Sequence, residues 1–266
     1  MHLDERLQAV AAFVPKNCIL ADIGTDHAYL PVWLLEKGAI SRAIAGDIAA
    51  GPCQAARTTV AMHGMAERVE VRQGSGLAVV RAGEVDCVAI CGMGGSTIIS
   101  ILEADFAVAR SVQRLVLQPM AGAASLRRWL VEHGWELVQE SLVDDEPHFY
   151  QIICAKPVEA SAATEGSSVG EASAATEGSS VDVGSAATEG SSVSVPAASV
   201  YSPAELVIGP TLLRDGHPLL AKHISREIAG CEELLANMGR SEKARASAKY
   251  AEVQELLSEL KGIGVI

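Results

Sequence analysis

Short apolar runs alternate with longer amphipathic stretches through the first 156 residues. Apolar runs bounded by turn residues are typical of buried parallel strands. This alternation predicts a doubly wound, mostly parallel sheet with helices on both faces. The five expected strands are residues 18–24, 43–48, 68–74, 85–92 and 114–119. The four expected helices are residues 27–37, 52–63, 96–103 and 124–133.

Two further strand-like runs follow, WELVQESLVDD at 135–145 and HFYQIICAKP at 148–157. Because only two residues separate them, we expect an antiparallel hairpin that closes the sheet. The predicted fold class is therefore α/β and Rossmann-like, with a seven-stranded, mostly parallel sheet and an antiparallel last strand. Residues 1–156 are expected to form this domain.

The tail, residues 204–266, has a different pattern, because its apolar side chains recur at spacings of three and four. Two such stripes, separated at Gly239, predict two helices packed as an antiparallel coiled-coil hairpin. The pair could project outward or dock on the sheet domain for stability alone. The stripes are Leu220, Ile224, Ile228, Cys231, Leu235 and Met238, then Tyr250, Val253, Leu257 and Leu260.

Between these parts, the nonapeptide SAATEGSSV begins at Ser161, Ser173 and Ser185, a strict repeat. Residues 157–203 are small, polar and acidic, and they cannot bury enough apolar surface to offset the entropy of ordering. We expect a disordered acidic linker. It carries about half of the net charge of −12, since no Lys or Arg lies between residues 157 and 200.

Composition narrows the class of protein. The 266 residues are 49% hydrophobic, which suits a globular core, yet no apolar run approaches the roughly 20 residues that span a bilayer. We expect a cytoplasmic protein without a membrane segment. The six cysteines form no C-x-x-C pair, so buried reduced thiols are expected and a metal site is not. The sequence leaves the oligomeric state open, a monomer included.

The first predicted strand runs into ILADIGTDHAYLP, residues 19–31. A dinucleotide site needs several glycines at this turn so that the backbone can approach a pyrophosphate. Of the glycines in that pattern, this chain has only the middle one, Gly24, and the carboxylates of Asp22 and Asp26 would repel phosphates. Carboxylates suit instead a ligand with an ammonium and a sulfonium group. S-adenosylmethionine has both, and Asp22 is the expected partner of its amine.

Three later strand ends extend this pocket. Asp47 lies 23 residues after Gly24, close to the spacing at which such folds bind a ribose hydroxyl, although it could merely cap a helix. Ser75, in GSGL, is expected beside the adenine ring. The loop CGMGGS at 91–96 supplies Gly92 and Met93 where cofactor and substrate meet, although such a loop is also an ordinary strand-to-helix turn.

These motifs, in order, resemble the bacterial tRNA (adenine-22-N1)-methyltransferases. The resemblance covers residues 1–156 and about 204–263, and it depends on ADIGTDHAYLP, AGDIAAGP, VRQGSGL, ICGMGGSTIISILE and LVLQP. It implies a class I methyltransferase fold, S-adenosyl-L-methionine as cofactor, and tRNA as partner, with the tail assisting docking. The chain departs from the family in reading GSGL where members often read GDGL, and in its acidic repeats.

Adenine N1 has an available lone pair, so the implied reaction needs no general base and depends on positioning. The base must leave its stack to expose N1. Because the methylated ring is cationic, a nearby carboxylate would stabilise it, and Asp26 is the candidate catalytic residue. His27 and Tyr29 are expected to contact cofactor or base, although helix packing would also explain them. Gln118 is expected to line the substrate mouth with Met93.

Cations that could contact tRNA lie on the tail and after the fifth strand. Solvated helix faces carry such charges routinely, so this pattern is weak by itself. With the net charge of −12, binding should be modest and strongly salt-dependent. The candidates are Arg127 and Arg128, then Lys222, Arg226, Arg240, Lys243, Arg245 and Lys249.

Three other functions remain open from the residues alone. The chain could methylate a small molecule or a protein, with the tail serving dimerisation. It could be a non-catalytic regulator that binds S-adenosylmethionine as a signal. A nicotinamide oxidoreductase fits worst, because the first turn lacks the glycines of that site.

Overall fold

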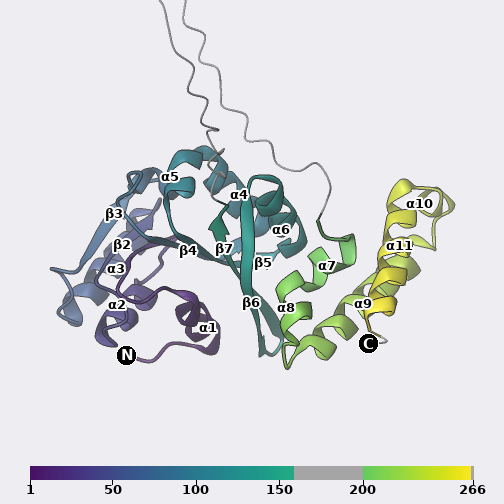
Figure 1. Ribbon diagram of the computed structural model, residues 1–266, viewed down its shortest axis with the longest axis horizontal. Coiled ribbons are helices and arrows are strands. Elements are labelled where there is room, and N and C mark those ends of the chain that lie inside the picture. The colour runs from purple at the N-terminus through teal and green to yellow at the C-terminus, as the bar shows by residue number, and fades with distance from the viewer. Residues whose placement is uncertain (159–199, 265–266) are drawn as a thin grey trace, which may run out of the picture.

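The computed structural model describes residues 1–158 and 200–264. The repeats, and with them almost all of the linker predicted to be disordered, lie outside the described residues. Residues 1–158 contain one mixed sheet with helices on both faces, and the later residues contain helices (Figure 1).

The sheet has seven strands in the order β3-β2-β1-β4-β5-β7-β6. Strands β1 to β5 pair in parallel, and β7 is antiparallel to both of its neighbours, β5 and β6. The predicted fold and the closing hairpin are confirmed, with β7 inserted between β5 and β6. The strands are β1 (Ile19–Ile23), β2 (Arg42–Asp47), β3 (Val69–Gln73), β4 (Cys87–Gly94), β5 (Arg114–Ala121), β6 (Trp135–Asp145) and β7 (His148–Pro157).

Helices cover each face of the sheet over its own apolar cluster. On one face α4 and α6 pack over β4 and β5 through Ile98, Leu126 and their neighbours, and on the other face α1, α2 and α3 do so through Val10, Leu34 and theirs. The four predicted helices are present, whereas α1, α5 and the short 3-10 helix η1 were not predicted. The bounds are α1 (Glu5–Phe13), α2 (Tyr29–Glu36), α3 (Ala50–Met62), η1 (Gly76–Val79), α4 (Gly95–Ala104), α5 (Phe106–Ser111) and α6 (Ala123–Glu132).

All six cysteines are free thiols, and all but Cys91 are buried, as the sequence predicts. Within the described residues, no group of His, Cys, Asp and Glu could hold a metal ion. In that same part of the chain, no helix is both long and apolar enough to cross a membrane.

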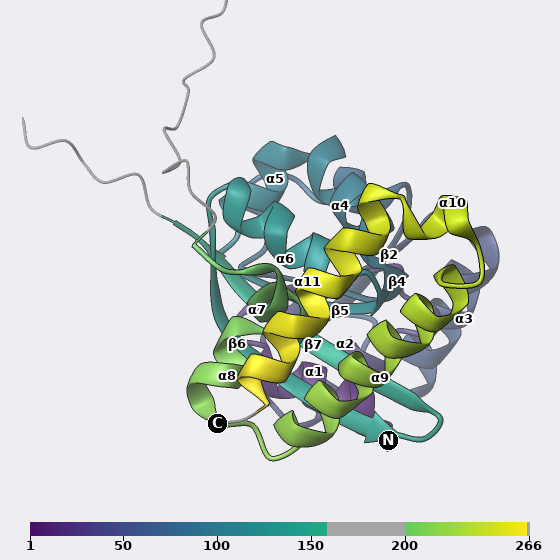
Figure 2. The ribbon, with the colours of Figure 1, turned by 90° about the vertical axis from the view of Figure 1, so that its right-hand side faces the viewer.

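The tail begins with two short helices and continues as a hairpin of two long ones. Helices α9 and α11 run antiparallel, because Lys261 near the end of α11 pairs with Glu232 of α9 at 2.7 Å and Gly264 lies against Ile224. They share the apolar cluster with α7, and they extend away from the sheet (Figures 1 and 2). The bounds are α7 (Pro203–Ile208), α8 (Pro210–Asp215), α9 (Leu220–Met238), α10 (Glu242–Arg245) and α11 (Ala248–Ile263).

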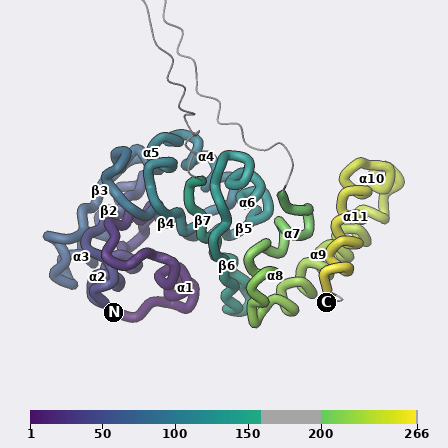
Figure 3. Tube along the Cα trace, in the orientation of Figure 1, coloured from purple at the N-terminus to yellow at the C-terminus, as the bar shows by residue number. Residues whose placement is uncertain are grey.

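Arg127 joins the tail to the sheet domain, which corrects its prediction as a tRNA contact. Its side chain on α6 is fully buried, and its Nε donates to Glu140 of β6 at 2.5 Å. Its Nη1 donates to the carbonyl oxygens of Leu206 and Val207 on α7. A guanidinium enclosed in this way is not accessible to a phosphate. Figure 3 shows α7 and α8 lying between the sheet and the tail hairpin.

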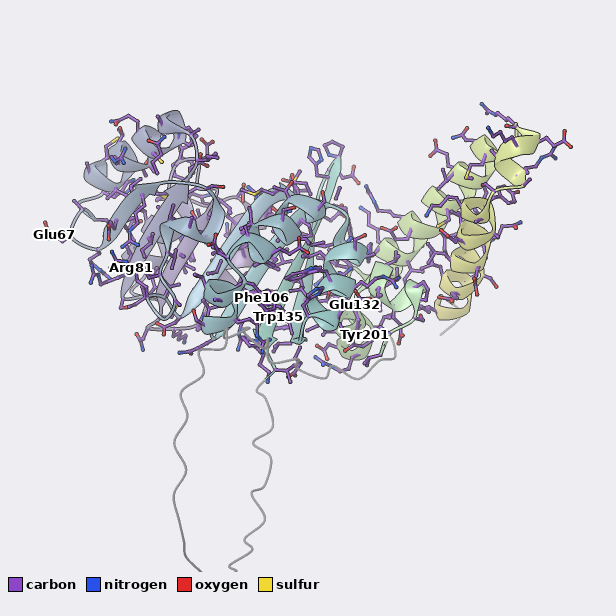
Figure 4. The ribbon with its side chains drawn as sticks, turned by 90° about the horizontal axis from the view of Figure 1, so that it is seen from above. Glu67, Arg81, Phe106, Glu132, Trp135 and Tyr201 are labelled. Atoms are coloured by element: carbon purple, nitrogen blue, oxygen red, sulfur yellow. The ribbon has the colours of Figure 1, made fainter. Side chains whose placement is uncertain are left out.

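An aromatic cluster packs around Trp135, the first residue of β6. Phe106 of α5 contacts Trp135 edge to face, with ring centroids 5.3 Å apart (Figure 4). Arg110 donates to the carbonyl oxygens of Gly134 and Val158, so the end of β7 is held beside this cluster. Tyr201, where the described chain resumes, packs on the same core. The end of β7 therefore lies at the edge opposite the carboxyl ends of the parallel strands.

Candidate active site

The carboxyl ends of β1, β2, β4 and β5 bring the predicted site residues to one edge of the sheet. In the parallel register, Ile23 of β1 lies between Gly46 of β2 and Ile90 of β4, and Cys91 lies beside Gln118 of β5. The turns that follow these strands therefore meet at one edge, where ligands bind in open α/β sheets.

Asp22 is the buried carboxylate of this edge, with 8% of its surface exposed. Burial raises its pKa to about 6, and a hydrogen bond from Thr25 and the positive charge of Arg6 oppose that rise. The side chain is thus mostly ionised at neutral pH in a poorly solvated place. A carboxylate of this kind gains much from a cationic ligand.

The turn after β1 is fixed by its backbone. Gly24 has φ of +77°, and the amides of Gly24 and Thr25 both donate to the carbonyl oxygen of Gly46, at 2.8 and 3.0 Å. The Thr25 hydroxyl accepts from the amide of Ala28, which enters α2 in a left-handed conformation. A side chain at residue 24 would be strained, and its Cβ would overlap the ε-methyl of Met93. Two strands thereby hold Asp22 and the start of α2 in place.

Asp26, His27 and Tyr29 lie together at the outer rim of this turn. The carboxylate of Asp26 is 3.4 Å from His27 Nε2, and the side chain of Asp26 is 77% exposed. The rings of His27 and Tyr29 stack, with centroids 4.9 Å apart and planes 8° apart. Tyr29 is itself 45% exposed. These contacts do not bury the side chains against the core, so all three remain accessible to a ligand.

Gln118 organises the irregular end of β4, where the register shifts between Cys91 and Gly94, from the neighbouring strand. It is fully buried, and its Oε1 accepts from the amide of Gly92 at 3.1 Å and from Arg6 Nη1 at 2.8 Å. Gly92 has φ of +75°, which allows the turn to present its amide to this oxygen. Gln118 was predicted to line the substrate mouth, but the structure places it beneath the loop that carries Met93. It is thus placed to position that loop.

Asp47 and Ser75 complete the edge on the far side of β1. Asp47 Oδ1 accepts from the amide of Ala49 at 2.7 Å, which closes a turn just before α3, but Asp47 does not cap that helix, whose N-cap residue is Ala49. The carboxylate has a second oxygen available. The amide of Gly74 donates to the carbonyl oxygen of Asp47, which places the turn with Ser75 beside β2. Ser75 is exposed and precedes η1.

The two tail residues predicted to bind tRNA have different surroundings. Lys222 Nζ contacts Asp144 and lies 3.3 Å from Glu146, both near the tip of the β6–β7 hairpin. These carboxylates raise the pKa of Lys222 and offset its charge. Arg226 is exposed, and its guanidinium lies over the Phe149 ring, 5.2 Å from the centroid. Of the two, Arg226 is the better placed to meet a phosphate.

Sequence reasoning missed two residues of this site, Arg6 and Thr25. Arg6 lies on α1, before the first strand and outside every motif, and it reaches Gln118 only because α1 packs across the sheet. Thr25 lies within the quoted motif, but its hydrogen bond to Asp22 depends on the fold of the turn. The one available signal was its position between two aspartates.

Comparison with known proteins identifies the family. Residues 3–153 match the family model of a methyltransferase domain. A tRNA (adenine(22)-N(1))-methyltransferase from Bacillus subtilis is 38% identical over 169 residues, which are 64% of this chain and 71% of that protein. The chain belongs to the tRNA (adenine(22)-N(1))-methyltransferase family. The resemblance predicted from the motifs is confirmed.

Solved structures extend the family likeness into the tail. The structure of the Bacillus subtilis tRNA methyltransferase superposes with a TM-score of 0.76 at 28% identity, covering 99% of each chain. A Streptococcus pneumoniae protein in complex with S-adenosyl-L-methionine superposes with a TM-score of 0.74 at 28% identity, covering 99% of this chain and 100% of that one. The family fold thus includes the helices after the sheet.

Proposed function

We propose that this chain transfers a methyl group from S-adenosylmethionine to N1 of the adenine at position 22 of tRNA. The observation that carries the proposal is the buried Asp22 near the end of β1, in a chain from the tRNA (adenine(22)-N(1))-methyltransferase family. The Bacillus subtilis relative is named for this reaction.

The residues of the edge suit S-adenosylmethionine. Asp22 would hold its ammonium group, and Gly24 leaves backbone space beside it. The second carboxylate oxygen of Asp47 would accept from the ribose, and Ser75 would meet the adenine. This edge of the sheet offers carboxylates where a pyrophosphate would need amides and cations, which disfavours a nicotinamide cofactor.

The reaction requires positioning more than proton transfer. S-adenosylmethionine supplies an electrophilic methyl on its sulfonium, and the N1 lone pair forms the new bond as the sulfur–carbon bond breaks. Since positive charge passes to the adenine ring, the exposed carboxylate of Asp26 would stabilise the product side. His27 and Tyr29, stacked beside it, offer an aromatic surface for the extruded base. Met93, opposite Gly24, would border the path between the two ligands.

The tail would dock the tRNA, with Arg226 closest to the site. Because the chain carries a net charge of −12, few cations face the substrate and binding should weaken steeply with salt. We also propose a cytoplasmic location, where tRNA is found. We further propose that the tail, residues 204–266, is a separate domain that docks tRNA.

Nucleoside analysis tests the proposed reaction. After incubation with S-adenosylmethionine and unmodified tRNA, digestion and chromatography should yield 1-methyladenosine and no other methylated nucleoside. Asp22→Asn serves as the control with weakened cofactor binding. A different methylated nucleoside, or none with cofactor bound, contradicts the proposal.

A further inference from the structure

A groove separates the sheet domain from the first half of α9. Its volume is about 430 Å³, and it is formed by the end of β5, the start of α6, the β6–β7 hairpin and α9. Met120 and Gly122 line one side of the groove, and Phe149 and Tyr150 of the β6–β7 hairpin line another. His223 and Arg226 of α9 line the side formed by the tail. Because Gly94 of β4 pairs with Ala121 of β5, the groove begins next to the loop that carries Met93.

His223 is the unusual side chain of this groove. It is 1% exposed, and neither ring nitrogen has a partner at full hydrogen-bond geometry among the residues that the structure describes, although the backbone of Ile208 and Val207 lies beside the ring. Glu227 Oε1 is 3.8 Å from its Nδ1, too far for such a bond. Burial, and then the charge of Arg127, lower its pKa to about 4, against a weaker opposing effect of the Ile208 and Val207 carbonyls. A neutral imidazole offers one donor and one acceptor, and leaving them unpaired inside the protein is unfavourable.

The surroundings of His223 indicate what kind of partner would satisfy it. Its ring stacks on Phe149, with centroids 5.4 Å apart and planes 18° apart. Arg226, over the same phenyl ring, adds a positive charge at the mouth. Flat aromatic surface, one donor, one acceptor and one cation match a base and its phosphate in single-stranded RNA.

We propose that this groove binds a nucleotide of tRNA that neighbours the target adenine. Its base would lie against the Phe149 side of the groove and hydrogen-bond to His223, and its phosphate would meet Arg226. This inference rests on the proposed function, since it assigns a second nucleotide subsite to the same substrate. Holding the neighbour away from its stack would help to keep the target adenine extruded.

His223→Phe tests the subsite, because phenylalanine keeps the flat ring and removes both nitrogens. We expect the KM and the Kd for tRNA to rise about tenfold, while kcat and S-adenosylmethionine affinity stay within twofold. The melting temperature of the ligand-free variant should not fall, because an unpaired polar group has been removed. The matched control is His63→Phe. In the wild type, His63 of the sheet domain pairs with Glu36 of α2, so its replacement should leave the KM and the Kd for tRNA unchanged.

Nitrogen-15 spectra of histidine-labelled wild-type protein give a readout that does not depend on the folding of a variant. Adding tRNA should shift the ring resonances of His223. Unchanged His223 resonances at saturating tRNA, or equal tRNA Kd for wild type and His223→Phe, would overturn the subsite. If the wild type binds tRNA but methylates none, the proposed function fails, and these two binding measurements still decide the groove.

Discussion

At the scale of single residues, the burial of the Asp22 carboxylate opposes folding and favours the binding of a cationic ligand. The folded-state pKa of about 6 lies above the ordinary 3.8, so the folded protein binds the proton more tightly than the unfolded chain. Stability contributed by this group is present at low pH and is lost as pH rises from about 4 to about 6. The shift of roughly two pKa units corresponds to about 3 kcal/mol at neutral pH.

Asp22→Asn should therefore raise the melting temperature of the ligand-free protein at pH 7 by several degrees, since the buried charge is removed. The same change should weaken S-adenosylmethionine binding tenfold to hundredfold, because a charge-assisted hydrogen bond is lost. Thermal denaturation and calorimetry measure the two effects. Asp26→Asn, which replaces an exposed carboxylate, should not raise the melting temperature. A lower melting temperature for Asp22→Asn than for the wild type at pH 7 would contradict the raised pKa of Asp22.

The affinity of the wild type for S-adenosylmethionine should also depend on pH through Asp22. Below about pH 6 the carboxylate becomes protonated and loses its attraction for an ammonium group, so the Kd should rise up to tenfold per pH unit. Calorimetry between pH 5 and pH 8 measures this slope, and Asp22→Asn should remove most of it. A flat wild-type profile would mean that another group holds the amine.

At the scale of elements, the pair formed by Arg127 and Glu140 connects α6, β6 and the tail. Glu140 Oε2 also accepts from the amide and hydroxyl of Thr211 on α8, so both partners are fully hydrogen-bonded. Removing one partner of such a buried pair leaves an uncompensated charge. The pair therefore fixes how the tail meets the sheet.

Arg127→Met should destabilise the protein by about 3–5 kcal/mol, measured by chemical denaturation. Arg127→Met with Glu140→Leu should recover much of that loss, because no unpaired charge remains. Arg128→Ala, on the exposed side of the same helix, is the matched control and should change stability by less than about 0.5 kcal/mol. A cost for Arg127→Met as small as that of the control would argue against the pair as the connector.

The strands and helices of the sheet domain could be predicted because their apolar periods are long and regular. Helix α1, with Arg6, was missed because it precedes the first strand and carries no motif. The role of Arg127 could not be predicted, since its partners lie on β6 and α7 and only the fold brings them together. The strand-end residues Asp22, Gly24 and Asp47 were found because parallel strands bring their carboxyl ends to one edge; the contacts of Gln118 were not.

At the scale of the whole molecule, the charges are unevenly arranged for a protein that binds a polyanion. The chain leaves the described structure at the sheet edge opposite the candidate site, because β7 is antiparallel to β5 and Val158 accepts from Arg110 there. Exposed cations of the tail, Lys243, Arg245 and Lys249, lie in α10 and at the start of α11, at the end of the hairpin that is farther from the sheet (Figure 1).

Replacing Lys243, Arg245 and Lys249 together by Gln should raise the tRNA KM about tenfold and reduce the salt dependence of binding by roughly two phosphate contacts. The control replaces Lys37, Arg42 and Arg57 by Gln, an equal change of net charge on exposed residues of the sheet domain. Filter binding across a salt series measures both. Equal effects of the two triple variants would show that net charge, and not the tail, governs binding.

Transfer of radiolabelled methyl from S-adenosylmethionine to two tRNA transcripts, identical except for adenine or guanine at position 22, tests the central claim most directly. The account predicts label in the adenine transcript and none above background in the guanine transcript. Equal label in both transcripts would contradict the assigned position. No label in either, with S-adenosylmethionine bound, would contradict the assigned reaction.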